Sequence, residues 1–231
     1  MAPGDNMSTA TTGNGHRQAV LPATNDAKVV TIKAPNFQVA EFKLVGTAPL
    51  VVNKFSQKAR EQIMKTQSEG KQSRGKKVRE PKDFDAVYKG AFHVSSEGWY
   101  GFPAGGFKAA LVRACSVTDM KMTVSKMALF IEADGIDADE GTPLVKINGT
   151  PKKHEGYARN DDGSVDIRVR PLWAKWTINL RVRYDGDMLS LESVANLVSR
   201  AGLQVGIGEG RPFSKNSTGM GWGTFAIEGK Q

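Results

Sequence analysis

The sequence predicts a single domain of the α+β class, and three observations support this prediction. The segments Phe37–Gly46 and Trp176–Tyr184 alternate apolar and polar residues, as half-buried strands do. The segments Phe107–Ala114 and Leu191–Ala201 instead repeat apolar residues at helical spacing. With 231 residues, the chain is long enough to bury one substantial hydrophobic core.

The domain is expected to begin after a disordered N-terminal arm. Residues 1–36 are rich in Ser, Thr, Gly, Asn and Ala and have no sustained apolar periodicity. Residues 37–231 then form the domain, which starts with the strand Phe37–Gly46. The apolar face of that strand carries Ala40, Phe42 and Leu44.

A short helix and a basic segment follow this strand. Ser56 is placed to cap a helix that runs to about Lys65, with Ile63 and Met64 as its apolar contacts. Residues 66–82 lack apolar periodicity and hold far more basic than acidic side chains. The basic residues are Lys71, Arg74, Lys76, Lys77, Arg79 and Lys82. We interpret this segment as a flexible basic flap that folds over a phosphate backbone, with a solvated loop as the alternative.

The middle of the domain is predicted to contain a helix, a strand and an insertion. Pro103 introduces the helix, whose core-facing residues are Phe107, Ala110, Leu111 and Ala114. A strand follows at Met127–Asp134. Residues 135–172 are interpreted as a thumb-like hairpin in which the strands Leu144–Ile147 and Val165–Arg170 flank a basic tip. The tip carries Lys152, Lys153, His154, Tyr157 and Arg159.

The last part of the chain supplies a strand, a helix and a final strand. After Trp176–Tyr184, Ser190 is placed to cap the helix and Gly202 to end it in the left-handed conformation. Gly221–Glu228 is the final strand. The core order is therefore strand, helix, strand, strand, helix, strand, which is the ferredoxin-like pattern shared with RNA-recognition domains.

The segment Gly206–Gly223, here called the glycine loop, separates this helix from the last strand. Gly206, Gly208 and Gly210 alternate with other residues, and glycine permits a positive φ that turns successive N–H groups toward an anion. Arg211 and Lys215 add positive charge. The loop follows a helix and lacks the Gly-Lys-Ser/Thr order, which excludes the P-loop and the dinucleotide fingerprint. A flexible turn is the alternative.

Composition narrows the class of partner. The net charge of +8 and the sequence pI near 9.5 favour nucleic acid or another anionic surface. The single cysteine, Cys115, permits no intrachain disulfide and fits a reducing cytosol. No stretch approaches the roughly 20 apolar residues of a membrane span. We therefore expect a cytoplasmic protein with no membrane partner.

Three segments carry a resemblance to a known family. They are Gly46–Leu50, the helix entry Gly101–Arg113 with its proline, small residues, lysine and arginine, and the glycine loop. Each is similar to a motif of the RAMP superfamily, in particular of the backbone subunits that coat guide RNA in CRISPR effector complexes. The two insertions also fall where that family places them. The chain is similar as well to compact, uncharacterised proteins of bacteriophages and prophages.

The resemblance implies a ferredoxin-like core in the cytoplasm of a bacterial host cell. It implies copies that assemble side by side along a single strand, as a homo-oligomer or filament, with other effector subunits as further partners. Cleaving members of the family carry an acidic residue after the first strand, whereas Thr47–Lys54 holds no carboxylate. The resemblance therefore implies binding without cleavage.

We therefore expect a non-enzymatic protein that binds single-stranded RNA or DNA and uses no cofactor and no metal. The predicted nucleic-acid-binding residues are Lys54, Lys71, Arg74, Lys76, Lys77, Arg79, Lys108, Arg113, Lys152, Lys153, Arg168, Arg170, Gly206, Gly208, Gly210, Arg211, Lys215 and Trp222.

Three alternatives remain open. The first is a metal-independent endoribonuclease with His93 or His154 as general acid or base, although we expect both histidines to be exposed or to contact phosphate. The second is a nucleotide-binding protein whose glycine loop holds one phosphate ligand. The third is a divalent-cation site among acids such as Asp134 and Asp137, which we interpret instead as a solvated acidic segment.

Overall fold

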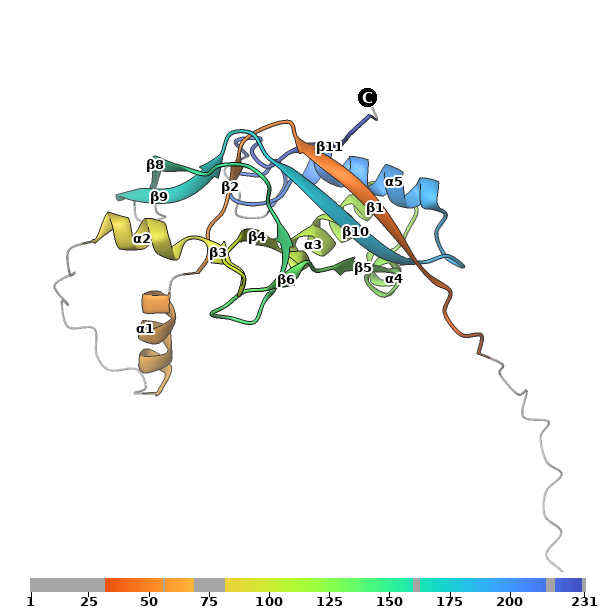
Figure 1. The fold of residues 1–231 in the computed structure, drawn as a ribbon, viewed down its shortest axis with the longest axis horizontal. Helices are drawn as coiled ribbons and strands as arrows, with labels where there is room; N and C mark the ends of the chain where they lie inside the picture. Colours follow the sequence, from red (N-terminus) through yellow and green to blue (C-terminus); the bar gives the residue numbers. More distant parts are fainter. Residues whose placement is uncertain (1–31, 56, 69–81, 160–162, 215–218, 230–231) are drawn as a thin grey trace, which may run out of the picture. The chain divides into compact units, whose positions relative to one another are not determined.

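The structure is a computed structural model that describes residues 32–55, 57–68, 82–159, 163–214 and 219–229 (Figure 1). Contacts between Cα atoms divide the chain into two units, Met1–Ala34 and Pro35–Gln231. Nearly all of the first unit, and with it the predicted arm, lies outside the described residues. All helices and strands below belong to the second unit.

The main sheet has four antiparallel strands in the spatial order β11, β1, β10 and β5. Their bounds are β1 Phe37–Gly46, β5 Leu129–Glu132, β10 Thr177–Asp185 and β11 Phe225–Ile227. The strands β1 and β10 pair along almost their whole length, from Phe37 opposite Asp185 to Val45 opposite Thr177. Both were predicted from apolar alternation, and their predicted inward residues are buried. The fold is thus α+β with antiparallel sheets.

Two helices share one hydrophobic core with this sheet (Figure 1). They are α3, Ala104–Ala114, which follows β1 and precedes β5 in the chain, and α5, Leu191–Arg200, which lies between β10 and β11. The four predicted core-facing residues of α3 are all buried, which confirms the helical spacing. Ser190 caps α5 as predicted, because its side-chain oxygen accepts a hydrogen bond from the N–H of Ser193 at 3.1 Å.

Two smaller antiparallel sheets complete the β structure. One contains β2 Leu50–Val51, β9 Val165–Trp173 and β8 Lys152–Arg159, and the other β3 His93–Val94, β4 Tyr100–Pro103, β7 Pro143–Lys146 and β6 Gly135–Ile136. The pairing differs from the predicted hairpin over 135–172. The hairpin consists of β8 and β9, whereas β7 pairs with β4 and β6. The strand β8 was not predicted because it carries polar residues on both faces, so its sequence lacks the apolar alternation of a half-buried strand.

The remaining helices are α1 Gln57–Ser68, α2 Phe84–Gly90 and α4 Met122–Ala128. The first was predicted, but its predicted apolar contacts are wrong, since Ile63 and Met64 are both exposed. Its predicted cap, Ser56, lies outside the described residues. The helices α2 and α4 were not predicted, because seven residues each give too few turns for a clear apolar stripe.

The end of α5 differs from the prediction. The chain continues beyond α5 through a π-helical turn, Ala201–Val205, and the first residue with positive φ is Gly206, at 70°. Gly202 has another role, since a Cβ atom there would lie 2.1 Å from the carbonyl oxygen of Phe225. Its lack of a side chain lets the end of the helix pack against β11.

A buried ionic cluster joins the segment after β2 to the β3–β4–β7–β6 sheet. The Nζ atom of Lys54 lies 2.8 Å from a carboxylate oxygen of Asp137 and 2.8 Å from one of Asp139. The Nδ1 atom of His93 lies 3.0 Å from the other oxygen of Asp137. Asp137 also accepts hydrogen bonds from the backbone N–H groups of Asp139 and Glu140, at 3.0 and 3.1 Å. The cluster therefore holds a carboxylate that is almost fully buried.

Folding shifts the pKa values of Asp137 and Lys54 in opposite directions. Burial alone would raise the pKa of Asp137, but the Lys54 ammonium, the two N–H groups and His93 outweigh burial and lower it. Burial alone would lower the pKa of Lys54, but Asp137 and Asp139 outweigh burial and raise it. The stabilisation from Asp137 is therefore complete above its unfolded-state pKa and disappears as the pH falls through its lower folded-state pKa.

We predict that Asp137→Asn lowers the free energy of unfolding at neutral pH by about 3 kcal/mol, because it leaves the buried Lys54 short of its main counter-charge. The difference from the wild type should begin to shrink as the pH falls below about 4, where the carboxylate of the unfolded chain gains its proton, and should vanish below the lower folded-state pKa. Urea unfolding over a pH series measures both effects.

The matched control is Asp139→Asn, because the carboxylate of Asp139 is 74% exposed. It should cost less than about 1 kcal/mol. Equal losses for the two variants, or a loss at Asp137 that does not change with pH, would contradict the role assigned to the buried carboxylate.

Candidate nucleic-acid interface

A cleft of about 260 Å³ lies between α3 and the glycine loop. Its lining combines guanidinium groups, phenyl rings and glycine backbone from Phe102, Arg113, Gly206, Gly208, Arg211 and Phe213. Four of these are predicted site residues, and Arg113 lies far from the other three in the sequence. The fold thus brings the predicted phosphate contacts of α3 and of the glycine loop to one place.

The α3 side of the cleft depends on close packing of an aromatic ring. A Cβ atom at Gly106 would lie 2.5 Å from the ring of Phe102, so glycine lets that ring lie along the first turn of the helix. Near the other end of α3, the guanidinium carbon of Arg113 lies 4.0 Å from the centroid of the Phe213 ring. This cation–π contact holds the Arg113 side chain between the helix and the glycine loop.

The loop side depends on glycine backbone. The six glycines at 206, 208, 210, 219, 221 and 223 have φ values between 65° and 78°, the conformation that the sequence predicts. Two of them also permit a close approach. A Cβ atom at Gly208 would lie 2.4 Å from the carbonyl oxygen of Val51, and one at Gly223 would lie 1.8 Å from that of Ile207. The glycines therefore hold the loop against β2 and against itself.

Several backbone N–H groups of the glycine loop are already used within the domain, so they are not available to an anion. Those of Ile207, Glu209 and Gly223 donate to carbonyl oxygens within the domain, at 3.0, 2.9 and 2.7 Å. Within the described residues, the N–H groups of Gly208 and Gly210 have no hydrogen-bond partner, and Gly208 lines the cleft. The predicted row of successive N–H donors is thus reduced to alternate positions. The N–H groups of Ile207 and Glu209, between the glycines, instead donate to carbonyl oxygens of the domain.

Arg211 is held at the cleft by the loop itself. Its Nη1 atom donates to the carbonyl oxygen of Gly208 at 2.8 Å. The bond fixes the direction of a long side chain, which reduces the conformational entropy that a bound phosphate would otherwise have to overcome.

The β8–β9 hairpin borders the glycine loop through a third set of predicted residues. Glu209 accepts from Nη1 of Arg168 at 3.4 Å and from Nε of Arg170 at 3.1 Å. The ring of His154 meets that of Trp222 edge-on, with centroids 5.3 Å apart. The predicted cations Arg168 and Arg170 therefore lie beside the loop, but each has an acidic partner.

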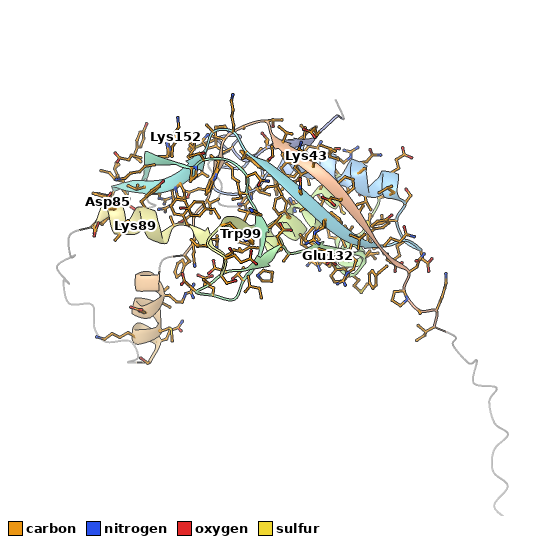
Figure 2. The ribbon with its side chains drawn as sticks, viewed as in Figure 1. Lys43, Asp85, Lys89, Trp99, Glu132 and Lys152 are labelled. Carbon is orange, nitrogen blue, oxygen red and sulfur yellow. The ribbon has the colours of Figure 1, made fainter. Side chains whose placement is uncertain are left out.

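The two lysines at the start of β8 differ from each other. Both are exposed, but Lys153 forms an ion pair with Asp85 of α2 at 2.8 Å, whereas Lys152 has no ion pair among the described residues. Figure 2 shows Lys152 on the hairpin and Asp85 and Lys89 on the neighbouring helix. The hairpin surface is therefore of mixed charge rather than uniformly basic.

Four predictions differ from the structure. Asp137, interpreted as part of a solvated acidic segment, is only 2% exposed and lies at the centre of the buried ionic cluster. Lys54 lies in the buried ionic cluster, so it has no place at a phosphate surface. His93 belongs to the same cluster and is buried, although exposure was expected. Lys108 does not line the cleft, because its ammonium lies 4.3 Å above the ring of Phe130 at the edge strand β5. In each case the side chain contacts a partner that is distant in the sequence.

Six predicted site residues lie outside the described residues. They are Lys71, Arg74, Lys76, Lys77, Arg79 and Lys215. The site is therefore built from the cleft and the hairpin alone.

Sequence reasoning missed three residues that shape the interface. Phe102 and Phe213 form its aromatic walls, and Glu209 neutralises two arginines. An aromatic residue inside a glycine-rich loop was a usable signal for Phe213. No local signal marks Glu209, because its partners lie in β9, 39 and 41 positions earlier in the chain.

The described residues contain no group of three or more His, Cys, Asp or Glu side chains that could hold a metal ion. Among the described helices, none is both long and apolar enough to cross a membrane.

No protein-family model matches the chain, and no curated protein matches its sequence significantly.

We predict that Gly223→Ala destabilises the domain more than Gly221→Ala. Both glycines have positive φ, at 66° and 76°, so both substitutions incur the left-handed backbone cost of about 1–2 kcal/mol. Only Gly223 also faces a carbonyl oxygen, whereas a Cβ atom at Gly221 meets nothing within 4 Å. Thermal unfolding of the two variants measures the difference. Equal losses would show that the close approach to Ile207 contributes nothing.

Proposed function

We propose that this chain binds single-stranded nucleic acid, RNA or DNA, through phosphate contacts in the cleft between α3 and the glycine loop. The observation that carries the proposal is the convergence of Arg113 and Arg211 on one cleft, beside the rings of Phe102 and Phe213. Proteins that bind single strands combine positive charge, which contacts the phosphate backbone, with aromatic rings, on which the bases stack. The neighbouring hairpin, with Lys152 exposed, would extend the contact surface.

We further propose a ferredoxin-like core made of the main sheet, α3 and α5. The chain order β1, α3, β5, β10, α5, β11 and the antiparallel spatial order β11, β1, β10, β5 support this proposal. With it, the resemblance to guide-coating RAMP subunits supports copies that assemble side by side along the strand in the cytoplasm of a bacterial cell. Other effector subunits would be further partners.

We propose that the protein leaves the bound strand whole. The segment Thr47–Lys54 offers no carboxylate that could recruit a metal or move a proton. His93 is buried against Asp137, and His154 has its ring against Trp222. A general acid or base must reach the proton that it transfers, and neither position favours this. Incubation with labelled RNA, with magnesium or with a chelator, tests the proposal, and regular cleavage would contradict it.

One observation favours a second candidate, a nucleotide-binding protein. A cleft of about 260 Å³ is close in size to a site for a single small ligand. The two candidates separate in one titration, because a strand-binding protein prefers a long oligonucleotide to a mononucleotide by orders of magnitude. Equal affinity for both would favour the second candidate.

We predict that Arg113→Gln and Arg211→Gln each weaken binding of single strands of every sequence to the same extent, because phosphate contacts position the strand without reading it. Each variant should also reduce the slope of log affinity against log salt by about 0.7. Fluorescence anisotropy with labelled oligonucleotides of different sequence measures both quantities.

Lys43→Gln is the matched control. It removes one positive charge from an exposed pair with Glu228 at 2.9 Å, and Figure 2 shows it on β1. Affinity and salt slope should stay at the wild-type values in this variant. If all three variants behave alike, the cleft is not the site. If the arginine variants only lower the melting temperature, their role is structural.

We predict that Glu209→Gln tightens binding about fivefold at low salt. The substitution frees Arg168 and Arg170 for phosphate and removes a negative charge beside the cleft, and release of roughly 1 kcal/mol corresponds to this factor. Glu228→Gln makes the same change of charge at the exposed pair with Lys43 and should leave affinity unchanged. Weaker binding by Glu209→Gln would mean that the arginines act only through their ion pairs.

A further inference from the structure

We propose that the pocket beside Trp99 is a second site, which takes a planar nucleobase in an unstacked state. The inference deepens the proposed function and rests on it for the source of the base, a nucleotide of the bound strand. The pocket has a volume of about 410 Å³ and is separate from the cleft at α3, since the two share no lining residue.

The pocket lies where two sheets meet. The backbones of Asn148, after β7, and Thr177, in β10, exchange hydrogen bonds of 2.9 and 3.0 Å and join the β3–β4–β7–β6 sheet to the main sheet. The lining residues come from four separate segments of the sequence: Glu97 and Trp99, Asp134, Lys146 and Asn148, and Asn179. Their side chains are therefore brought together by the tertiary fold.

Trp99 is held as a half-buried platform rather than as part of the core. A Cβ atom at Gly101 or Gly135 would lie 3.0 or 2.6 Å from its six-membered ring, so two glycines make room for the indole on this sheet. The Nε1 atom donates to a carboxylate oxygen of Glu97 at 3.1 Å. The ring is thus fixed in position and satisfied at its polar edge, as a stacking surface requires.

The carboxylate of Asp134 is engaged at both oxygens, whereas the amide of Asn179 remains for a ligand. One oxygen of Asp134 accepts from Arg181 at 3.1 Å and the other from the backbone N–H of Lys146 at 2.8 Å. Glu97 is engaged by Trp99. Within the described part of the chain, the side-chain amide of Asn179 has no hydrogen-bond partner, and it is exposed at the pocket. An asparagine amide offers one donor and one acceptor, which match the edge of a base.

Lys146 completes the geometry. Its Nζ atom lies 6.0 Å from the centroid of the Trp99 ring. A base stacked on the indole would lie about 3.5–4 Å above it, so the flexible Lys146 side chain would swing outward to admit the base. The ammonium could then donate to an oxygen or ring nitrogen at the edge of the base. A planar ligand with carbonyl or ring-nitrogen acceptors could accept from this ammonium and from the amide of Asn179.

The test uses adenosine, which has a base and no phosphate, and tripolyphosphate, which has phosphate and no base. Tryptophan fluorescence is recorded in the Trp222→Phe background, where Trp173 and Trp176 are buried. Adenosine should quench the Trp99 signal, tripolyphosphate should not, and Asn179→Ala should weaken the quenching while the indole stays in place. The double variant Arg113→Gln, Arg211→Gln should still respond to adenosine.

With single-stranded oligonucleotides, Trp99→Ala should lower affinity about 5- to 150-fold, the range for one stacked base, and Trp99→Phe should retain part of the affinity. Absence of quenching by adenosine, equal quenching by a plain sugar, or full oligonucleotide affinity in Trp99→Ala would each overturn the inference. If oligonucleotides fail to bind the wild type while adenosine still quenches Trp99, the proposed function fails and the pocket stands as a nucleoside site.

Discussion

The arrangement of the candidate interface depends on backbone approaches that are too close for any side chain. Gly208 lies against the carbonyl of Val51, Gly223 against that of Ile207, and Gly202 against that of Phe225. These contacts attach the end of α5 and the glycine loop to β2 and β11. Arg211 and Phe213 reach the cleft only because the loop that carries them is held in this way.

On the hairpin side of the candidate interface, three of the cations are held in ion pairs. Arg168 and Arg170 face Glu209, and Lys153 faces Asp85. A phosphate that binds Arg168, Arg170 or Lys153 would replace a carboxylate, so binding there would exchange one partner for another. Such exchange gives a smaller gain than the net charge of +8 suggests, and it favours a ligand that offers many phosphates at regular spacing.

The long periodic elements were predictable, because burial of one face leaves a repeat in the sequence. This holds for β1, β10, α3 and α5. It fails for β8, which is polar on both faces, and for the seven-residue helices α2 and α4. A glycine after a helix was also ambiguous, since the sequence does not tell whether the position needs a positive φ, as Gly206 does, or a close approach, as Gly202 does.

The candidate site was predictable in its parts but not in its assembly. Local cues indicated Arg113 on its helix and Arg211 in its loop, and the fold brings them to one cleft. Burial of Lys54 had no local cue, because its partner Asp137 is 83 positions away. The same reason hides Glu209 and the surroundings of Trp99. Long-range pairs decide which charged residues stay at the surface.

In the glycine loop, the residues that set the backbone path differ from the residues that present side chains to a ligand. Positive φ at Gly206, Gly208 and Gly210 fixes the path of the backbone whatever stands between them. Ile207 is buried in the core, whereas Glu209 and Arg211 are only partly buried, so these two positions can change charge at little cost to the fold. A chain built in this way can acquire a new ligand preference by substitutions at alternate positions, while the frame that presents them persists.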